Sequence, residues 1–121
     1  MVNDFNRTGY EGPKYFGSGK NPESFINKLI SISNNKQNDL VLDFFLGSGT
    51  TTAAAHKLGR RWIGIEMGEH FYTVVIPRMK KVLFYDKSGI SKETDIKEKY
   101  NKNNAGGFFK YCELEQFEDV L

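Results

Sequence analysis

The chain has 121 residues, of which 39% are hydrophobic and 26% charged, with a formal net charge of +2. This is the composition of one globular domain and excludes a disordered or collagen-like chain. No apolar run reaches the roughly 18 residues that span a bilayer, and the first residues do not form a secretory signal. One cysteine and two histidines exclude an internal disulfide, a thiolate zinc cluster and a histidine-based metal site. We expect a cytoplasmic, metal-independent protein.

Residues 1–19 hold four glycines, a proline and scattered aromatics without a sustained period, which predicts an irregular N-terminal arm. Residues 20–121 form the predicted domain. Its first helix starts at Asn21-Pro22-Glu23, because Asn caps free amides, Pro fits the first position and Glu suits the positive end. Apolar residues continue at helical spacing to Ile32, and Asn34-Asn35 ends the element.

A strand buried on both faces is expected over residues 40–46, followed by a glycine-rich turn and a short helix over 50–58. Gly59 can end that helix, and residues 61–66 predict a second strand. A further helix begins near Glu69, and Pro77 should kink or break it.

A polar, mobile loop is expected over residues 87–104, and a third strand over 108–114. This alternation of helices and strands predicts an α/β fold with βαβ units and a right-handed parallel sheet.

The most informative residues follow the first strand and end the second, at the edge where parallel sheets bind ligands. Gly47 and Gly49 allow a ligand to approach the backbone, and Thr50 opens a helix whose positive end suits a carboxylate or phosphate. Glu66 can accept two hydrogen bonds from a ribose. A dinucleotide fingerprint would need glycine at Thr52, and no lysine follows Gly49 as a P-loop requires.

The segment Asp43-Phe44-Phe45-Leu46-Gly47-Ser48-Gly49-Thr50-Thr51 strongly resembles the S-adenosylmethionine-binding loop of permuted (beta-class) amino-DNA methyltransferases. Residues 19–25 resemble the Lys-x-Pro helix motif of that family, and residues 61–66 its ribose-binding strand. Residues 106–115 are similar to the modification subunits of Type III restriction-modification systems. The resemblance covers about residues 17–118 and implies a partial Rossmann-like, S-adenosylmethionine-dependent methyltransferase fold with flanking helices.

The resemblance also implies the cofactor contacts. The loop around the methionine part of the cofactor corresponds to Asp43, Phe45, Gly47 and Gly49, and its carboxylate site to Thr50 and Thr51. Glu66 corresponds to the acid that binds the ribose, and Met67 to the residue beside the adenine ring. The helix motif that closes the methionine end corresponds to Lys20, Pro22 and Ser24. Several of these have structural alternatives. Taken alone, the glycines can form a tight βα turn and Glu66 can be a surface acid. Asp43 can cap loop amides, Met67 can be ordinary packing, and Lys20 can be a solvated lysine.

The implied activity is site-specific DNA methylation, at adenine N6 or at cytosine N4, within a Type III restriction-modification system. The acceptor tetrapeptide [DNS]-P-P-[YFW] of the family is absent, because no two prolines adjoin. The resemblance therefore implies no catalytic residue here and no activity of this chain alone. The complete enzyme would act on bacterial DNA and could join a restriction subunit.

Without a neighbouring strand, residues 40–46 would form an open apolar edge, which predicts association with a second copy or with an upstream methyltransferase fragment.

Two other functions stay open. One is a non-catalytic assembly or regulatory fragment whose basic segment, residues 78–102, binds a partner or DNA. A solvated helix face and loop is the favoured explanation of that segment. The other is a domain that binds NAD.

Side chains outside the site receive simpler interpretations. Aromatic residues are expected in the core, namely Phe44, Trp62, Phe71, Phe108 and Phe109. Basic residues near the end of the 50–58 helix could meet DNA phosphates or be solvated, namely Lys57, Arg60 and Arg61. We assign no chemistry to His56 or Cys112.

Overall fold

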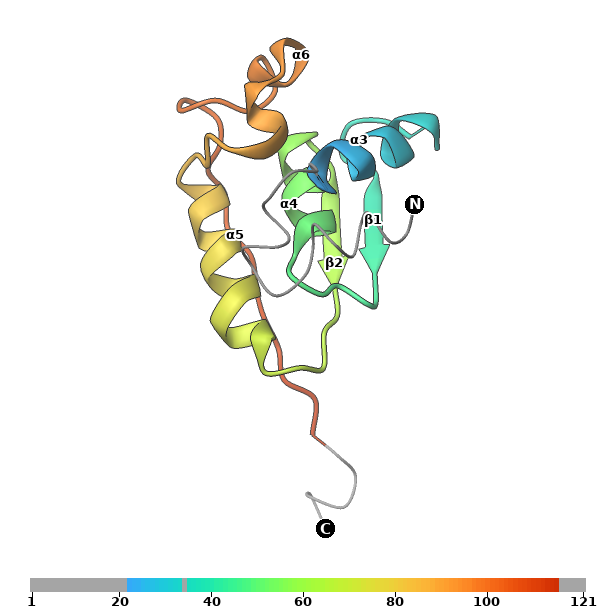
Figure 1. Ribbon diagram of the computed structural model, residues 1–121, viewed down its shortest axis with the longest axis vertical. Coiled ribbons are helices and arrows are strands. Elements are labelled where there is room, and N and C mark those ends of the chain that lie inside the picture. The colour runs from blue at the N-terminus through green and yellow to red at the C-terminus, as the bar shows by residue number, and fades with distance from the viewer. Residues whose placement is uncertain (1–21, 34, 116–121) are drawn as a thin grey trace.

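The computed structural model describes residues 22–33 and 35–115, so Lys20 and the predicted arm lie outside the described residues. Its elements, in chain order, are α3 (Pro22–Ile32), β1 (Leu40–Asp43), α4 (Thr50–Lys57), β2 (Arg61–Gly64), η1 (Phe71–Val75), α5 (Ile76–Leu83), η2 (Gly89–Lys92) and α6 (Thr94–Lys97). Helix α4 lies against the sheet, with α3 and α5 on either side of it (Figure 1). The structure therefore confirms the α/β class.

The two strands run parallel, with Leu40 opposite Arg61 and Asp43 opposite Gly64, as the βαβ pattern predicts. Helix α4 covers one face of this sheet. At Gly64 the helix and the loop come so close that an added Cβ would lie 2.9 Å from Thr52 Cγ2 and 2.5 Å from Leu46 Cδ2. Gly59 follows α4 with a positive φ of 77°, so it ends the helix as expected.

The opposite face of the sheet is not covered by the described residues, so the expectation of a first strand buried on both faces is wrong. Leu40 and Leu42 of β1, and Ile63 and Ile65 of the second strand and its continuation, are all exposed. In the described part of the chain, β1 pairs on one side only, with β2. Among the described residues the outer edge of β1 is therefore open, as expected, and it borders an exposed apolar face.

The helix expected near Glu69 is present but begins with a π-helical turn, Phe71–Val75, before α5. Pro77 stands at the start of α5. Because proline has no N–H to donate and collides with the carbonyl four residues before it, a regular helix would break there. The wider π turn accommodates the proline, and the helix continues.

The expectation of a mobile loop over residues 87–104 is wrong, because apolar side chains of this segment enter the core. Ile90, Ile96 and Tyr100 are almost fully buried. The Tyr100 hydroxyl donates to the carbonyl of Val82 and accepts the amide of Asp86 at 2.8 Å. Burial raises the pKa of Tyr100 to about 12, so this hydroxyl stays protonated.

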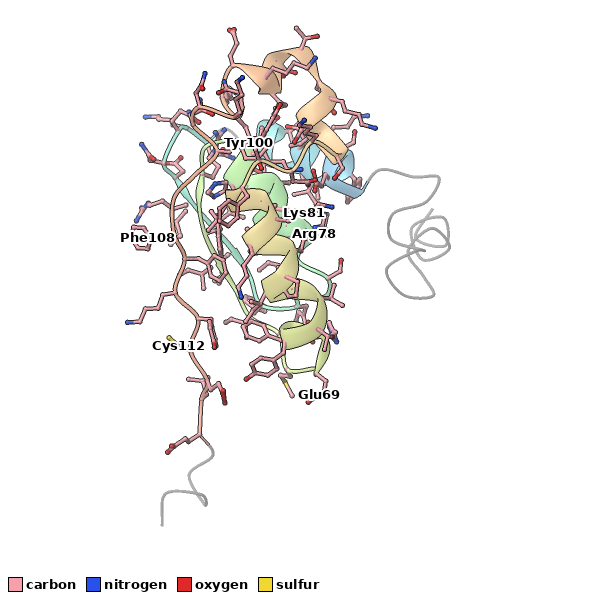
Figure 2. The ribbon with its side chains drawn as sticks, turned by 90° about the vertical axis from the view of Figure 1, so that its left-hand side faces the viewer. Glu69, Arg78, Lys81, Tyr100, Phe108 and Cys112 are labelled. Carbon is pink, nitrogen blue, oxygen red and sulfur yellow. The ribbon has the colours of Figure 1, made fainter. Side chains whose placement is uncertain are left out.

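The prediction of a third strand over residues 108–114 is also wrong. Residues 106–115 are extended but form no strand, and Phe108 points away from the helices with 90% of its surface exposed (Figure 2). Contact with β2 is made by side chains, the rings of Phe109 and Trp62 lying 5.9 Å apart. Such a contact leaves the backbone without the ladder that a strand needs.

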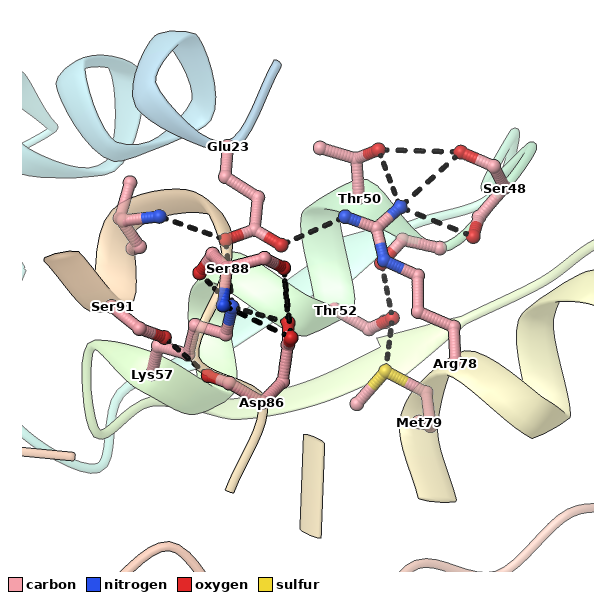
Figure 3. A network of polar contacts seen from close by, with 12 residues as sticks. Glu23, Ser48, Thr50, Thr52, Lys57, Arg78, Met79, Asp86, Ser88 and Ser91 are labelled. Carbon is pink, nitrogen blue, oxygen red and sulfur yellow. Dashed lines mark hydrogen bonds and ion pairs between the residues drawn. The ribbon is translucent and has the colours of Figure 1, made fainter. Parts of the chain in front are cut away.

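A buried ion cluster connects the helices (Figure 3). The side chain of Lys57 is 0% exposed, and its ammonium donates to Glu23 Oε1 at 2.9 Å and to Asp86 Oδ2 at 2.8 Å. It also donates to the Ser88 carbonyl at 3.0 Å. Lys57 is therefore neither a DNA contact nor a solvated lysine, because the helix places it against two carboxylates.

The neighbouring polar residues also hold the fold. Arg60 donates to Gln37 Oε1 at 2.9 Å, and Arg61 donates to the Asn38 carbonyl at 2.8 Å. Trp62 Nε1 lies 3.3 Å from His56 Nδ1, whose Nε2 lies 2.9 Å from the Ala105 carbonyl. Since the indole can only donate and the carbonyl can only accept, His56 carries its proton on Nε2.

Replacing Lys57 with methionine should strongly destabilise the protein. Methionine matches the lysine side chain as far as Cε, but it leaves Asp86 buried without its cation and Glu23 with Arg78 alone. Removing one partner of a buried ion pair costs about 3–5 kcal/mol. Urea unfolding followed by circular dichroism measures the loss, with the exposed Lys28→Met of α3 as control. A loss for Lys57→Met that matches the control would contradict the role of the cluster.

The cluster should also make stability depend on pH. Burial acts to raise the pKa of Asp86, but hydrogen bonds from Lys57 and Ser88 outweigh it and lower the pKa from 3.8 to about 2. Because the folded state holds this proton less tightly than the unfolded state, the carboxylate stabilises the fold above pH 3.8. That stabilisation is lost as the pH falls toward 2.

Thermal midpoints across this pH range test the prediction. Asp86→Asn should be less stable near neutral pH and should lose less stability than the natural protein on acidification. Exposed Asp95→Asn is the control, since it should follow the natural protein throughout. An unchanged acid response in Asp86→Asn would contradict the prediction.

Candidate functional site

The loop after β1 is held by its own backbone and by Asp43. Asp43 Oδ1 accepts the amide of Phe45 at 2.9 Å, so this carboxylate does cap a loop amide. The amide of Leu46 donates to the Ile65 carbonyl at 3.0 Å, which joins the loop to the end of β2. Gly47 and Gly49 have φ of 64° and 92°, a left-handed backbone that glycine adopts without strain.

Glu66 joins the glycine loop to the segment after β2. Its Oε1 accepts the amide of Gly47 at 2.7 Å, and its Oε2 accepts the amide of Gly68 at 3.0 Å. The Nε2 of His70 lies 3.2 Å from Oε2. Burial acts to raise the pKa of Glu66, but these partners lower it overall, so the group is a carboxylate near neutral pH.

The carboxylate of Glu66 still has room to accept donors. Each carboxylate oxygen has about two lone-pair sites, and Oε1 uses one of them for Gly47. Oε2 accepts the amide of Gly68 and lies 3.2 Å from the exposed ring of His70, and the amide of Met67 also interacts with the carboxylate. A ligand hydroxyl can therefore take the place of the His70 contact when that ring turns away. The side chain is 16% exposed, which leaves it reachable from solvent.

Helix α4 begins at Thr50, three residues after Gly47, whose amide the carboxylate of Glu66 accepts. Its N-cap residue, Gly49, has no side chain to cap the free amides, and the helix dipole favours an anion there. Thr50 Oγ1 lies 3.3 Å from Ser48 Oγ and accepts Arg78 at 3.0 Å. Thr51 follows in the same turn and is half-buried.

Arg78 and Glu23 belong to this site although sequence reasoning missed the first and assigned the second only to a helix start. Arg78 Nη1 donates to Thr50 Oγ1, and Arg78 Nη2 donates to Glu23 Oε2 at 2.8 Å (Figure 3). Their 55-residue separation leaves no spacing signal. The contact brings the first turn of α3, with Pro22 and the half-buried Ser24, to the glycine loop.

The apolar residues assigned to the site lie at its surface. Phe45 is 84% exposed and Met67 is 97% exposed, so the alternative that Met67 is ordinary packing is wrong. Phe44 is also exposed, and its ring meets that of Phe45 edge-on at 5.5 Å. The core positions expected for Phe44 and Phe108 are likewise wrong, whereas Trp62, Phe71 and Phe109 do pack against the core.

The described residues offer no metal centre. Within them, no group of three or more His, Cys, Asp or Glu side chains could hold a metal ion. Among the same residues no helix has the length and apolarity needed to cross a membrane. The features described above therefore form the candidate site: the glycine loop, the carboxylate of Glu66 and the start of α4.

Comparison with known proteins identifies similar sequences. Residues 4–77 match a family model of the N6/N4 methyltransferase type, described as DNA methylase. The chain is 39% identical over 120 residues to the probable type III restriction-modification enzyme HindVI Mod subunit of Haemophilus influenzae, covering 99% of this chain and 15% of that protein.

Shorter matches extend the comparison. The type II methyltransferase M.HinfI of Haemophilus influenzae is 44% identical over 60% of this chain and 20% of its own length. The type II methyltransferase M1.MboII of Moraxella bovis is 50% identical over 41% of this chain and 19% of its own. The chain thus spans a quarter or less of these relatives. No solved structure matches it significantly.

The backbone of the loop provides a test of its geometry. Gly47→Ala should destabilise the protein by about 1 kcal/mol, because an alanine must adopt a left-handed backbone there. Gly106→Ala is the matched control, since at both positions an added Cβ meets nothing within 4 Å but only Gly47 has a positive φ. Urea unfolding of both variants measures the difference. Equal stabilities would contradict the loop conformation.

Proposed function

Because the chain belongs to the N6/N4 family of DNA methylases, we propose that it is the cofactor-binding part of a DNA methyltransferase. The proposed cofactor is S-adenosylmethionine. The observation that carries the proposal is the 2.7 Å hydrogen bond between Glu66 and the amide of Gly47. That bond holds a hydroxyl-accepting carboxylate beside a loop that leaves space for a ligand and beside the free amides of α4.

Each part of the site has a matching part of the cofactor. Glu66 accepts the ribose hydroxyls, and the backbone at Gly47 and Gly49 lets the ligand approach closely. The hydroxyls and amides of Thr50 and Thr51 hold the carboxylate. When bound, the cofactor supplies an electrophilic methyl group attached to its sulfonium.

The remaining assigned residues close the site in this proposal. Asp43 holds the loop around the methionine part, and Phe45 covers that part. Met67 lies beside the adenine ring, where its full exposure leaves it free to cover a ligand. Pro22 and Ser24, at the start of α3, close the methionine end together with Lys20, which lies outside the described residues.

The methyl acceptor in this proposal is DNA, at adenine N6 in a Type III restriction-modification system. Adjoining prolines, which the acceptor motif requires, do not occur in this chain. We therefore propose that the chain positions the cofactor and transfers no methyl group by itself. The relatives are bacterial proteins. The proposal therefore places this chain in the bacterial cytoplasm, where the DNA is and where a restriction subunit could bind the complete methyltransferase.

Calorimetric titration with S-adenosylmethionine tests the proposal. The natural chain should bind it, and Glu66→Gln should bind it about tenfold more weakly, the effect of losing a charged hydrogen-bond acceptor. Glu69→Gln is the control, because Glu69 is a neighbouring exposed acid. NAD is the competing ligand. Binding of NAD in preference to S-adenosylmethionine, or no binding of either, would overturn the proposed cofactor.

The bare sheet face suggests a partner. We propose that a further segment of methyltransferase chain covers Leu40, Leu42, Ile63 and Ile65 and pairs with the open edge of β1. The size of the relatives supports this occupant, since the matched region is 15% of the Haemophilus Mod subunit. A two-stranded sheet alone is only marginally stable, so a covering segment would also stabilise the fold.

A mixing experiment tests this partner. The unmatched part of the Haemophilus Mod subunit, made as a separate polypeptide, should form a one-to-one complex with this chain in light scattering. Leu42→Lys should weaken the complex at least tenfold, because it puts a charge on the covered face. Lys36→Leu, an exposed change outside the sheet, is the control. A complex of two copies of this chain alone, or no complex, would contradict the proposed occupant.

A further inference from the structure

Arg78 is the residue that connects the candidate site to the buried ion cluster. We propose that Arg78 is a positioning residue that turns the hydroxyl of Thr50 into a hydrogen-bond donor for the carboxylate of S-adenosylmethionine. The inference rests on the proposed function and goes beyond it, because it assigns a role to a side chain that the family resemblance did not include.

The guanidinium of Arg78 spans two segments with different nitrogens. One nitrogen lies 3.0 Å from Thr50 Oγ1 and 3.4 Å from both Ser48 Oγ and the Ser48 carbonyl. The other lies 2.8 Å from Glu23 Oε2. Because the guanidinium is planar and its donors are fixed in a fork, the pairing with Glu23 sets the direction of the donor that faces Thr50.

The hydrogen-bond capacity of Thr50 then determines its role. A hydroxyl has one proton and two lone pairs. Arg78 can only donate, so it occupies one lone pair of Thr50 Oγ1. Thr50 Oγ1 and Ser48 Oγ lie 3.3 Å apart, and either hydroxyl can donate to the other. When Ser48 donates, the proton of Thr50 is left for the ligand. Thr50 is half-buried whereas Ser48 is buried, so the free donor is the one that a ligand can reach.

The charge of the cluster supports the same assignment. Two cations, Lys57 and Arg78, balance two carboxylates, Glu23 and Asp86. Without Arg78 the cluster would have a net charge of −1 behind the first turn of α4. A buried negative charge there would repel a carboxylate at the helix start. Arg78 therefore both directs the hydroxyl and keeps the site electrically suited to an anion.

Two ligands separate this role from a purely structural one. S-adenosylmethionine and its decarboxylated form share the adenosine, the sulfonium and the ammonium, and differ only in the carboxylate. Arg78→Met should bind S-adenosylmethionine at least tenfold more weakly in calorimetry and should bind the decarboxylated form as the natural chain does or more tightly. Arg78→Lys should give an intermediate loss, since it restores the charge but not the two-ended geometry.

The relay through Thr50 is tested by a double-variant cycle. Thr50→Val should selectively weaken binding of S-adenosylmethionine, and adding Arg78→Met should cause little further loss, because the two changes interrupt the same interaction. Lys80→Met is the control, since it removes an exposed cation from the same helix. Thermal unfolding shows whether each variant is folded. If Arg78→Met does not fold, Arg78→Lys replaces it in the double variant with Thr50→Val.

The outcomes are distinguishable. Equal weakening of both ligands in the Arg78 variants, or losses that add in the double variant, would overturn the assignment of Arg78 while leaving the proposed cofactor intact. Failure of the natural chain to bind either ligand would overturn the proposed function, and the role of Arg78 with it.

Discussion

The ammonium of Lys57 is completely buried, and a cation in the interior must be matched by charge and hydrogen bonds because it has left water. Its three acceptors come from the first turn of α3 and from the segment after α5, namely Glu23, Asp86 and the Ser88 carbonyl. Since Lys57 itself ends α4, these contacts can form together only when all three helices are in place. The cluster therefore links the three helices in the one arrangement in which its contacts can all form.

The same cluster extends into the candidate site, so stability and ligand binding share one network. Glu23 uses its second oxygen for Arg78, and Arg78 reaches Ser48 and Thr50 at the start of α4. On the other side of the glycine loop, Glu66 accepts the amide of Gly47. Two carboxylates from different elements thus act on the loop, one directly and one through an arginine. The loop is organised before any ligand arrives, which lowers the entropic cost of binding.

The sheet gives the domain an asymmetric surface. Its covered face packs against α4, while Leu42 and Ile63 remain exposed on the other face. Parallel sheets are usually covered on both faces, and two paired strands bury too little surface to form a stable sheet alone. The apolar face lies next to the candidate site, because Ile65 directly precedes Glu66. Phe45 and Met67 are exposed at the surface of the same site. Cofactor binding and contact with further methyltransferase chain would therefore occupy neighbouring surfaces.

Local patterns in the sequence were sufficient to predict α3, β1, α4 and β2, because helical periodicity, short apolar runs and glycines act over a few residues, although β1 is shorter than predicted and exposed on one face. They also singled out the glycine loop and Glu66, which the structure brings together. Only the tertiary structure decided what lies far apart in the chain: that Lys57 is buried, that Arg78 meets Thr50, and that residues 108–114 form no strand. Ion pairing and strand pairing depend on which groups meet in space, and no local pattern encodes that.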